Sequence, residues 1–288
     1  AISNLLQILS KEGDKILIVT PSYEPFYKSI VGNGRVPVYS PLIQKGNTYF
    51  LDFYDIEQKI RDENVKVFIF CNPHNPTGRV WKEEELREIA GICRRQGIPL
   101  ISDEIHQDIR RKGTEHIPMA RLYPEADWIF TCTAPSKTFN MAGNHMANIF
   151  IPNVEVRKEW EEKHYYLPNP LSIAATKAAY EKCRQWVDEL NAYIDENFVV
   201  MKRFFKENLP EVQFEIPEGT YLAWINMKNT GCSMKEIRDK FIREAGIHIE
   251  TGDMFVGNGD YCVRMNIACP RETLMTALRR MYAVFRRD

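Results

Sequence analysis

The stretch Trp128-Ile-Phe-Thr-Cys-Thr-Ala-Pro-Ser-Lys-Thr-Phe-Asn140 joins an apolar run to a short polar segment. The run from Trp128 to Cys132 predicts a buried strand, and the residues after it predict a polar turn that carries Lys137. Most lysines are solvated surface charges. An amine in a turn that follows a buried strand can instead serve as an imine-forming nucleophile. The residues that lie near it in the fold decide whether it is a surface charge or a nucleophile.

Three further apolar runs, at 15–20, 65–71 and 98–102, have the same form and are separated by segments with helical periodicity. Alternation of strand, loop and helix predicts βαβ units and a mostly parallel sheet that is covered on both faces. Such strands are apolar without strict alternation because both of their faces are buried. The sequence therefore predicts an α/β fold for this part of the chain.

The pattern changes near Asn153 to long helical periodicity, with one helix expected over 154–164 and a nearly continuous one to Leu209, interrupted around Cys183. We predict a large domain over 1–165, connecting helices over 166–208 and a small C-terminal α+β domain over 209–288. The small domain is expected to hold strands at 212–216, 220–227, 247–250 and 261–267 and helices at 233–245 and 271–286.

The composition limits the classes of function. Among 288 residues, 44% are apolar, and a net charge of -1 leaves no basic face for a nucleic acid. The seven cysteines form neither a CxxC pair nor a metal-type spacing with the histidines, which favours reduced thiols in a cytoplasmic protein without a metal site. No apolar run reaches the roughly 18 residues of a membrane span, so a small-molecule substrate is expected.

Four side chains lie within a few residues of the ends of predicted strands: Tyr23, Asn75, Asp103 and Lys137. Ligands of open parallel sheets bind at the carboxyl ends of the strands, so we expect these four side chains to face one crevice. Each also has an ordinary interpretation. Tyr23 can be a core aromatic residue, the stretch from Asn75 to Gly78 is a good turn sequence, and Asp103 with Glu104 can form a solvated cap.

Arg264 lies in the predicted strand 261–267 among apolar neighbours. A buried guanidinium is costly without a partner, and its fork matches the two oxygens of a carboxylate. This arginine is therefore expected to hold a bound carboxylate. An internal ion pair with an acidic side chain is the alternative.

These motifs together carry a family resemblance. In chain order they are Pro21-Ser-Tyr23, Asn75-Pro-Thr-Gly78, Ser102-Asp-Glu-Ile-His106, the Lys137 stretch and Val263-Arg-Met-Asn266. Their order and separation resemble the pyridoxal-phosphate enzymes of the aspartate aminotransferase fold, in particular the cystathionine β-lyase-like carbon-sulfur lyases. The resemblance implies pyridoxal 5'-phosphate as cofactor, an amino acid as substrate and a homodimer.

The resemblance also implies roles for the residues that bind the cofactor ring. Lys137 would be the catalytic amine, Asp103 would lie beside the pyridine nitrogen, Asn75 would bond the 3-oxygen and Tyr23 would stack on the ring. His106 would support the 3-oxygen side, with a packed structural histidine as the alternative.

Ser136 would bind the phosphate, and Arg264 would bind the substrate's α-carboxylate. The pattern departs from many aminotransferases at Ala134 and His145, where a serine and a phosphate-binding arginine are common. Because helical periodicity begins at Ala1 with no strand before it, the resemblance further implies that an N-terminal segment with part of the phosphate site precedes this sequence. We expect these 288 residues alone to bind the cofactor poorly.

The leading hypothesis is a carbon-sulfur β-lyase that converts cystathionine or a cysteine conjugate to a thiol, pyruvate and ammonia. An aminotransferase of aromatic or broad specificity would use the same lysine, aspartate and arginine and is the first alternative. A non-catalytic regulatory member of the fold is the second.

Overall fold

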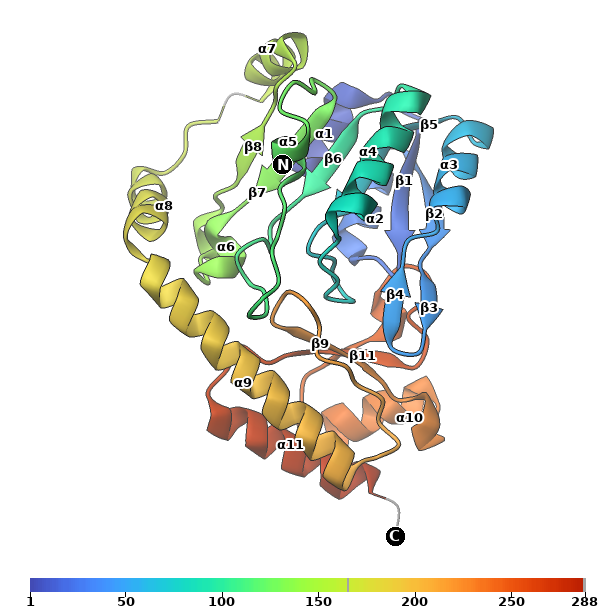
Figure 1. The fold of residues 1–288 in the computed structure, drawn as a ribbon, viewed down its shortest axis with the longest axis vertical. Coiled ribbons are helices and arrows are strands. Elements are labelled where there is room, and N and C mark those ends of the chain that lie inside the picture. Colours follow the sequence, from blue (N-terminus) through green and yellow to red (C-terminus); the bar gives the residue numbers. More distant parts are fainter. Residues whose placement is uncertain (165, 287–288) are drawn as a thin grey trace.

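A six-stranded sheet forms the centre of the larger part of the molecule (Figure 1). The computed structural model describes residues 1–164 and 166–286. The strand order is β2-β1-β5-β6-β7-β8, and every neighbouring pair is parallel except β7 and β8. The strands are β1 (Lys15–Thr20), β2 (Val36–Pro41), β5 (Val65–Cys71), β6 (Leu100–Asp103), β7 (Ile129–Thr133) and β8 (Asn148–Phe150). The predicted, mostly parallel α/β sheet is confirmed.

Helices cover both faces of this sheet, which explains why its central strands are apolar throughout. In β1, Ile16 and Ile18 join a core with helices α1 (Ile2–Leu9), α2 (Glu24–Val31) and α7 (Val154–Lys163). Leu17 and Val19 point to the other face, where α3 (Phe53–Asp62), α4 (Glu83–Gln96) and α5 (Met119–Leu122) pack. Successive side chains of a strand alternate between the two faces of the sheet. The short apolar run of β1 therefore contributes side chains to the hydrophobic cores on both faces.

Two helices, α8 (Pro170–Lys182) and α9 (Arg184–Asn208), lead from the large sheet to the C-terminal part (Figure 1). The helix breaks at Cys183, where the sequence predicts an interruption. From Ile194 onward, α9 is buried in the C-terminal apolar cluster through Ile194, Phe198, Met201 and Phe205. The proposed domain boundary at residue 165 lies outside the described residues.

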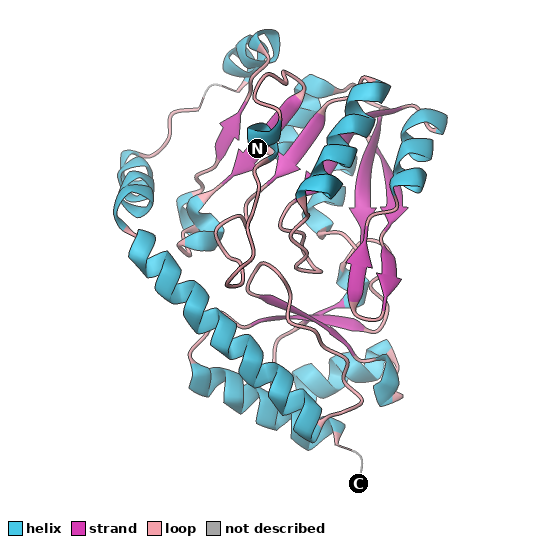
Figure 2. Cartoon of the chain, viewed as in Figure 1, coloured by secondary structure: helices cyan, strands magenta, loops and turns pink. Residues whose placement is uncertain are grey.

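The C-terminal part contains an antiparallel three-stranded sheet of order β10-β11-β9, backed by helices (Figure 2). Its elements are β9 (Leu222–Asn226), α10 (Met234–Asp239), β10 (Glu250–Thr251), β11 (Cys262–Asn266) and α11 (Arg271–Phe285). Its own apolar cluster includes Phe241, Val263, Leu278 and Met281. The expected small α+β unit is therefore present.

Several local predictions were wrong. Lys137 lies in a one-turn helix, α6 (Pro135–Thr138), and not in an open turn. Residues 212–216 form no strand, because only Gln213 pairs with β9, in an isolated bridge to Asn226; Val212 and Phe214 are nevertheless buried in the core. The helix expected over 233–245 changes after Asp239 to a π-helical turn, Lys240–Glu244.

The hairpin of β3 (Ile43–Lys45) and β4 (Thr48–Phe50) contacts the C-terminal sheet. Its Tyr49 hydroxyl accepts a hydrogen bond from Trp224 Nε1 on β9 at 3.0 Å. Arg79 donates from Nε to Glu218 at 2.9 Å and from Nη1 to the Tyr49 carbonyl. These bonds join the two parts of the molecule next to the carboxyl ends of the large sheet's parallel strands.

The described helices of residues 1–164 and 166–286 include none with the combined length and apolar character needed to cross a membrane. All seven cysteines are free thiols.

Candidate active site

A cavity of about 310 Å³ lies at the carboxyl ends of the parallel strands. It is lined by all the predicted site residues except Arg264, namely Tyr23, Asn75, Asp103, His106, Ser136 and Lys137. Ala134 and His145, the two positions that depart from the family pattern, line it as well. The parallel order of β1, β5, β6 and β7 brings these residues together, because each of these strands ends at the same edge.

Asp103 is the last residue of β6 and lies between two cysteines, Cys71 on β5 and Cys132 on β7. The aspartate is 8% exposed, so the solvated cap considered from the sequence is wrong. Burial raises the pKa of Asp103 to about 6, while the Ile105 backbone N–H, which donates to it at 3.2 Å, and the charge of Lys137 act in the opposite direction. A buried carboxylate with few donors is suited to a cationic partner.

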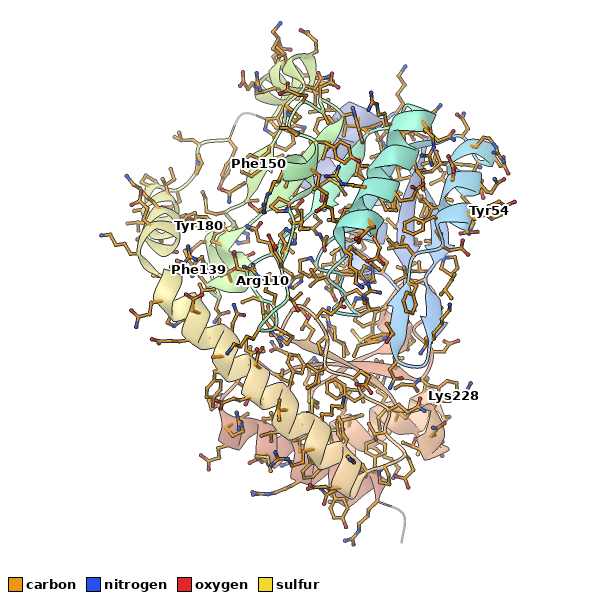
Figure 3. All side chains as sticks on the ribbon, in the orientation of Figure 1. Tyr54, Arg110, Phe139, Phe150, Tyr180 and Lys228 are labelled. Carbon is orange, nitrogen blue, oxygen red and sulfur yellow. The ribbon has the colours of Figure 1, made fainter. Side chains whose placement is uncertain are left out.

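Lys137 is held by the residues that follow it in the chain. Thr138 Oγ1 donates to Asp108 Oδ2 at 2.8 Å, and Phe139 packs edge-on against Tyr180 on α8 with ring centres 5.7 Å apart (Figure 3). Burial, followed by the positive charge of Arg264, lowers the pKa of Lys137, and Asp103 partly opposes this. The lowered pKa increases the fraction of Lys137 in the neutral form, which is the form that acts as nucleophile or base.

Arg264 enters from β11 and bonds Asn75 across the two parts of the molecule, Nη1 to Oδ1 at 2.5 Å. Its Nε donates to Glu250 Oε2 at 2.6 Å, and Nη2 donates to the same oxygen. The internal ion pair that the sequence left open as an alternative is therefore present. Because the Asn75 oxygen faces Arg264, its Nδ2 is the group left to bind a ligand, and it donates to no described residue.

His106 is 2% exposed, and its Nδ1 has no hydrogen-bond partner among the described residues. Burial, and then the charges of Lys137 and Arg264, lower its pKa to about 3, so the ring is neutral at physiological pH. Its edge lies against Tyr221, with ring centres 6.1 Å apart. An orphaned buried nitrogen beside a cavity indicates a position for a ligand's polar group.

Sequence reasoning missed the role of Glu104 as an anchor. Its carboxylate is fully buried on the side of the sheet away from Asp103 and accepts bonds from Ser102 Oγ at 2.9 Å and from the Met119 backbone N–H at 3.0 Å. His116 Nε2 lies 3.0 Å from it. These contacts fix both ends of the loop 105–118, which carries His106. The only sequence signal is the pair of adjacent carboxylates.

Comparison with known proteins places this geometry in a family. The model for aminotransferases of class I and II matches residues 1–281. The cystathionine beta-lyase PatB of Bacillus subtilis is 36% identical over 288 residues, which cover 98% of this chain and 74% of that protein. A solved C-S lyase from Staphylococcus hominis, with pyridoxal phosphate bound, is 43% identical with a TM-score of 0.95, covering 99% of this chain and 73% of that one. Cystalysin from Treponema denticola, whose structure contains pyridoxal 5'-phosphate, is 35% identical with a TM-score of 0.95 over 98% of this chain and 73% of that one.

The large sheet carries a lysine and a buried aspartate in one cavity at the carboxyl ends of its parallel strands. The chain belongs to the class I and II aminotransferase family. Its fold is the aspartate aminotransferase-like fold, and within the family it is similar to the cystathionine beta-lyases. The predicted recognition, fold class and enzyme class are confirmed.

Proposed function

We propose that this protein is a carbon-sulfur β-lyase that cleaves cystathionine or a related cysteine conjugate to a thiol, pyruvate and ammonia. Its cofactor is pyridoxal 5'-phosphate. The observation that carries the proposal is that one cavity is lined by both Lys137, whose pKa is lowered, and Asp103, a buried aspartate at the end of the neighbouring strand β6. The similarity to cystathionine beta-lyases supports the choice of reaction.

The side chains present fit the cofactor. The Asp103 carboxylate would face the protonated ring nitrogen, since that cation offsets the burial of its charge. The free Asn75 amide and the unpartnered His106 nitrogen would face the 3-oxygen, and the Tyr23 ring would cover one face of the pyridine. Ser136, which lines the cavity, would bind the phosphate. When bound, the cofactor withdraws electrons from the substrate's α-carbon.

The protein's own groups carry the proton transfers. Lys137, in its neutral form, takes the proton from the α-carbon, and burial favours that form because it lowers the pKa of the amine. Arg264 holds the α-carboxylate and so fixes which bond of the α-carbon faces the lysine. Loss of the thiolate from the β-carbon and addition of water complete the conversion to pyruvate and ammonia.

The test of the reaction class measures two products from one enzyme. With cystathionine, we expect stoichiometric pyruvate and thiol without any added keto acid. An aminotransferase would instead need a keto acid and release no pyruvate from cystathionine. Keto-acid-dependent turnover that exceeds pyruvate release would favour that alternative. The homodimer stays a prediction, which the mass of the protein in solution would test.

Arg264→Lys should raise KM for the amino acid at least about tenfold while changing kcat less. Lysine keeps the charge but loses the fork, and one charge-assisted hydrogen bond contributes about 1.5–3 kcal/mol. Steady-state kinetics of pyruvate release measure the effect. Arg238→Lys, which alters an arginine paired with Asp253, is the matched control. An unchanged KM for Arg264→Lys would contradict the assigned role.

A further inference from the structure

The arginine proposed to bind the substrate is already paired with a carboxylate of the protein. Glu250 on β10 lies directly opposite Arg264 on β11 in the antiparallel register. Its Oε2 accepts from Nε at 2.6 Å and from Nη2. The guanidinium carbon also lies 4.9 Å from the centre of the Phe255 ring and 5.8 Å from that of Tyr23. Strand pairing and two rings thus hold the cation in one place.

The hydrogen bonds leave room for a ligand, but the charges do not balance. A guanidinium has five N–H donors, of which three are used, two by Glu250 and one by Asn75. Two donors without a described acceptor remain for an incoming carboxylate. With Glu250 still in place, however, two anions would share one cation in a site where Arg264 is only 8% exposed. Repulsion between like charges is strong in such surroundings.

The two partners differ in how easily they can leave. The side chain of Arg264 is 8% exposed, whereas that of Glu250 is 39% exposed. Glu250 can therefore turn its carboxylate into water when an incoming carboxylate takes its place, whereas Arg264 is buried and needs an anionic partner throughout. Asn75 and the two rings keep the guanidinium in position when Glu250 leaves.

We propose that Glu250 is a displaceable counter-ion that positions Arg264 between turnovers and competes with the substrate's α-carboxylate, so that it sets the affinity for substrate. This inference rests on the proposed function only in taking Arg264 as the carboxylate site. Glu250 acts through Arg264 and is a positioning residue. The competition weakens ground-state binding, and its effect is therefore on KM more than on kcat.

The experiment removes the negative charge of Glu250 and keeps the shape of its side chain. In the cofactor-loaded full-length enzyme, Glu250→Gln should lower KM at least about threefold, in line with the modest energies of half-exposed ion pairs. Its amide oxygen still accepts one bond from Arg264. Glu250→Asn is a second neutral variant, for use if Glu250→Gln folds poorly, and it should also lower KM. Glu250→Asp keeps the charge, and its KM should be closer to that of the parent than the KM of either neutral variant. A merely structural role would raise KM in all three, and that result would overturn the proposal.

Asp253→Asn is the matched control. Asp253 lies three residues after Glu250, pairs with a different arginine, Arg238, and loses the same charge. It should leave KM within about twofold, as surface substitutions do. An equal fall in KM for Asp253→Asn would mean that net charge, and not competition for Arg264, is responsible, and would overturn the proposal.

A second readout does not depend on the reaction. Propionate presents a carboxylate alone, and its affinity for the cofactor-loaded enzyme can be followed by ligand-observed NMR titration. Glu250→Gln should bind propionate at least about threefold more tightly than the parent. Tighter propionate binding without any pyruvate release would support the counter-ion and leave the lyase assignment wrong. Normal pyruvate release with unchanged propionate affinity would overturn the counter-ion alone.

Discussion

Replacing Lys137 with alanine should lower the rate of pyruvate release at least about a thousandfold, because the variant loses both the nucleophilic amine and the base that moves the α-proton. The fold should survive. Lys137 lies in a one-turn helix that is anchored by its neighbours, through Thr138 to Asp108 and through Phe139 to Tyr180. Pyruvate release and thermal unfolding of the same preparation measure the two effects.

Two comparisons make the Lys137 result specific. Lys137→Arg keeps a positive charge without an amine that deprotonates near neutral pH, and we expect it to be as inactive as the alanine variant. Lys177→Ala removes an exposed lysine of α8 and should retain full activity. Turnover of Lys137→Ala within about tenfold of the parent would show that another group moves the proton.

Asp103→Asn should lower the activity of the enzyme and yet stabilise the cofactor-free protein at neutral pH. An amide cannot balance a protonated pyridine, so activity should fall at least about tenfold. In the cofactor-free protein, burial raises the pKa of Asp103 from 3.8 to about 6. That shift corresponds to roughly 3 kcal/mol of destabilisation when the carboxylate is charged in both states.

The pH dependence has a definite sign. Because the pKa is raised in the folded state, the folded protein holds its proton to higher pH than the unfolded chain. Below about pH 4, both states carry a neutral Asp103 and the variant should match the parent. Between about pH 4 and pH 6 the parent loses stability relative to the variant, and above that range the difference should be constant.

Urea unfolding of both cofactor-free proteins across this pH range measures the difference. Asp62→Asn, on an exposed side chain of α3, is the control and should change the free energy of unfolding by less than about 0.5 kcal/mol. With pyridoxal phosphate bound, the advantage of Asp103→Asn should shrink or reverse, because the parent then gains its cationic partner. A variant less stable than the parent at neutral pH without cofactor would show that the buried carboxylate is stabilised by groups other than those identified.

The order of motifs along the chain was enough to predict which strands deliver Lys137, Asp103, Asn75 and Tyr23, because side chains that follow parallel strands share one edge. The hydrophobic runs were equally sufficient for the central strands, which are buried on both faces. The sequence predicted the edge strands of the sheet less well than the central ones. β2 contains Pro37 and Pro41 and lies at an edge, where a strand can tolerate proline and lose its apolar pattern.

The partners of the charged residues were decided only by the tertiary structure. Arg264 meets Asn75 across 189 positions of sequence, and Glu250 meets it through the register of a two-residue strand that was expected to end at residue 250. Local patterns such as periodicity and turn residues determined where strands end and which side chains follow them. Whether a buried charge faces a ligand or another side chain depends on the packing of distant segments, and no local pattern specifies that.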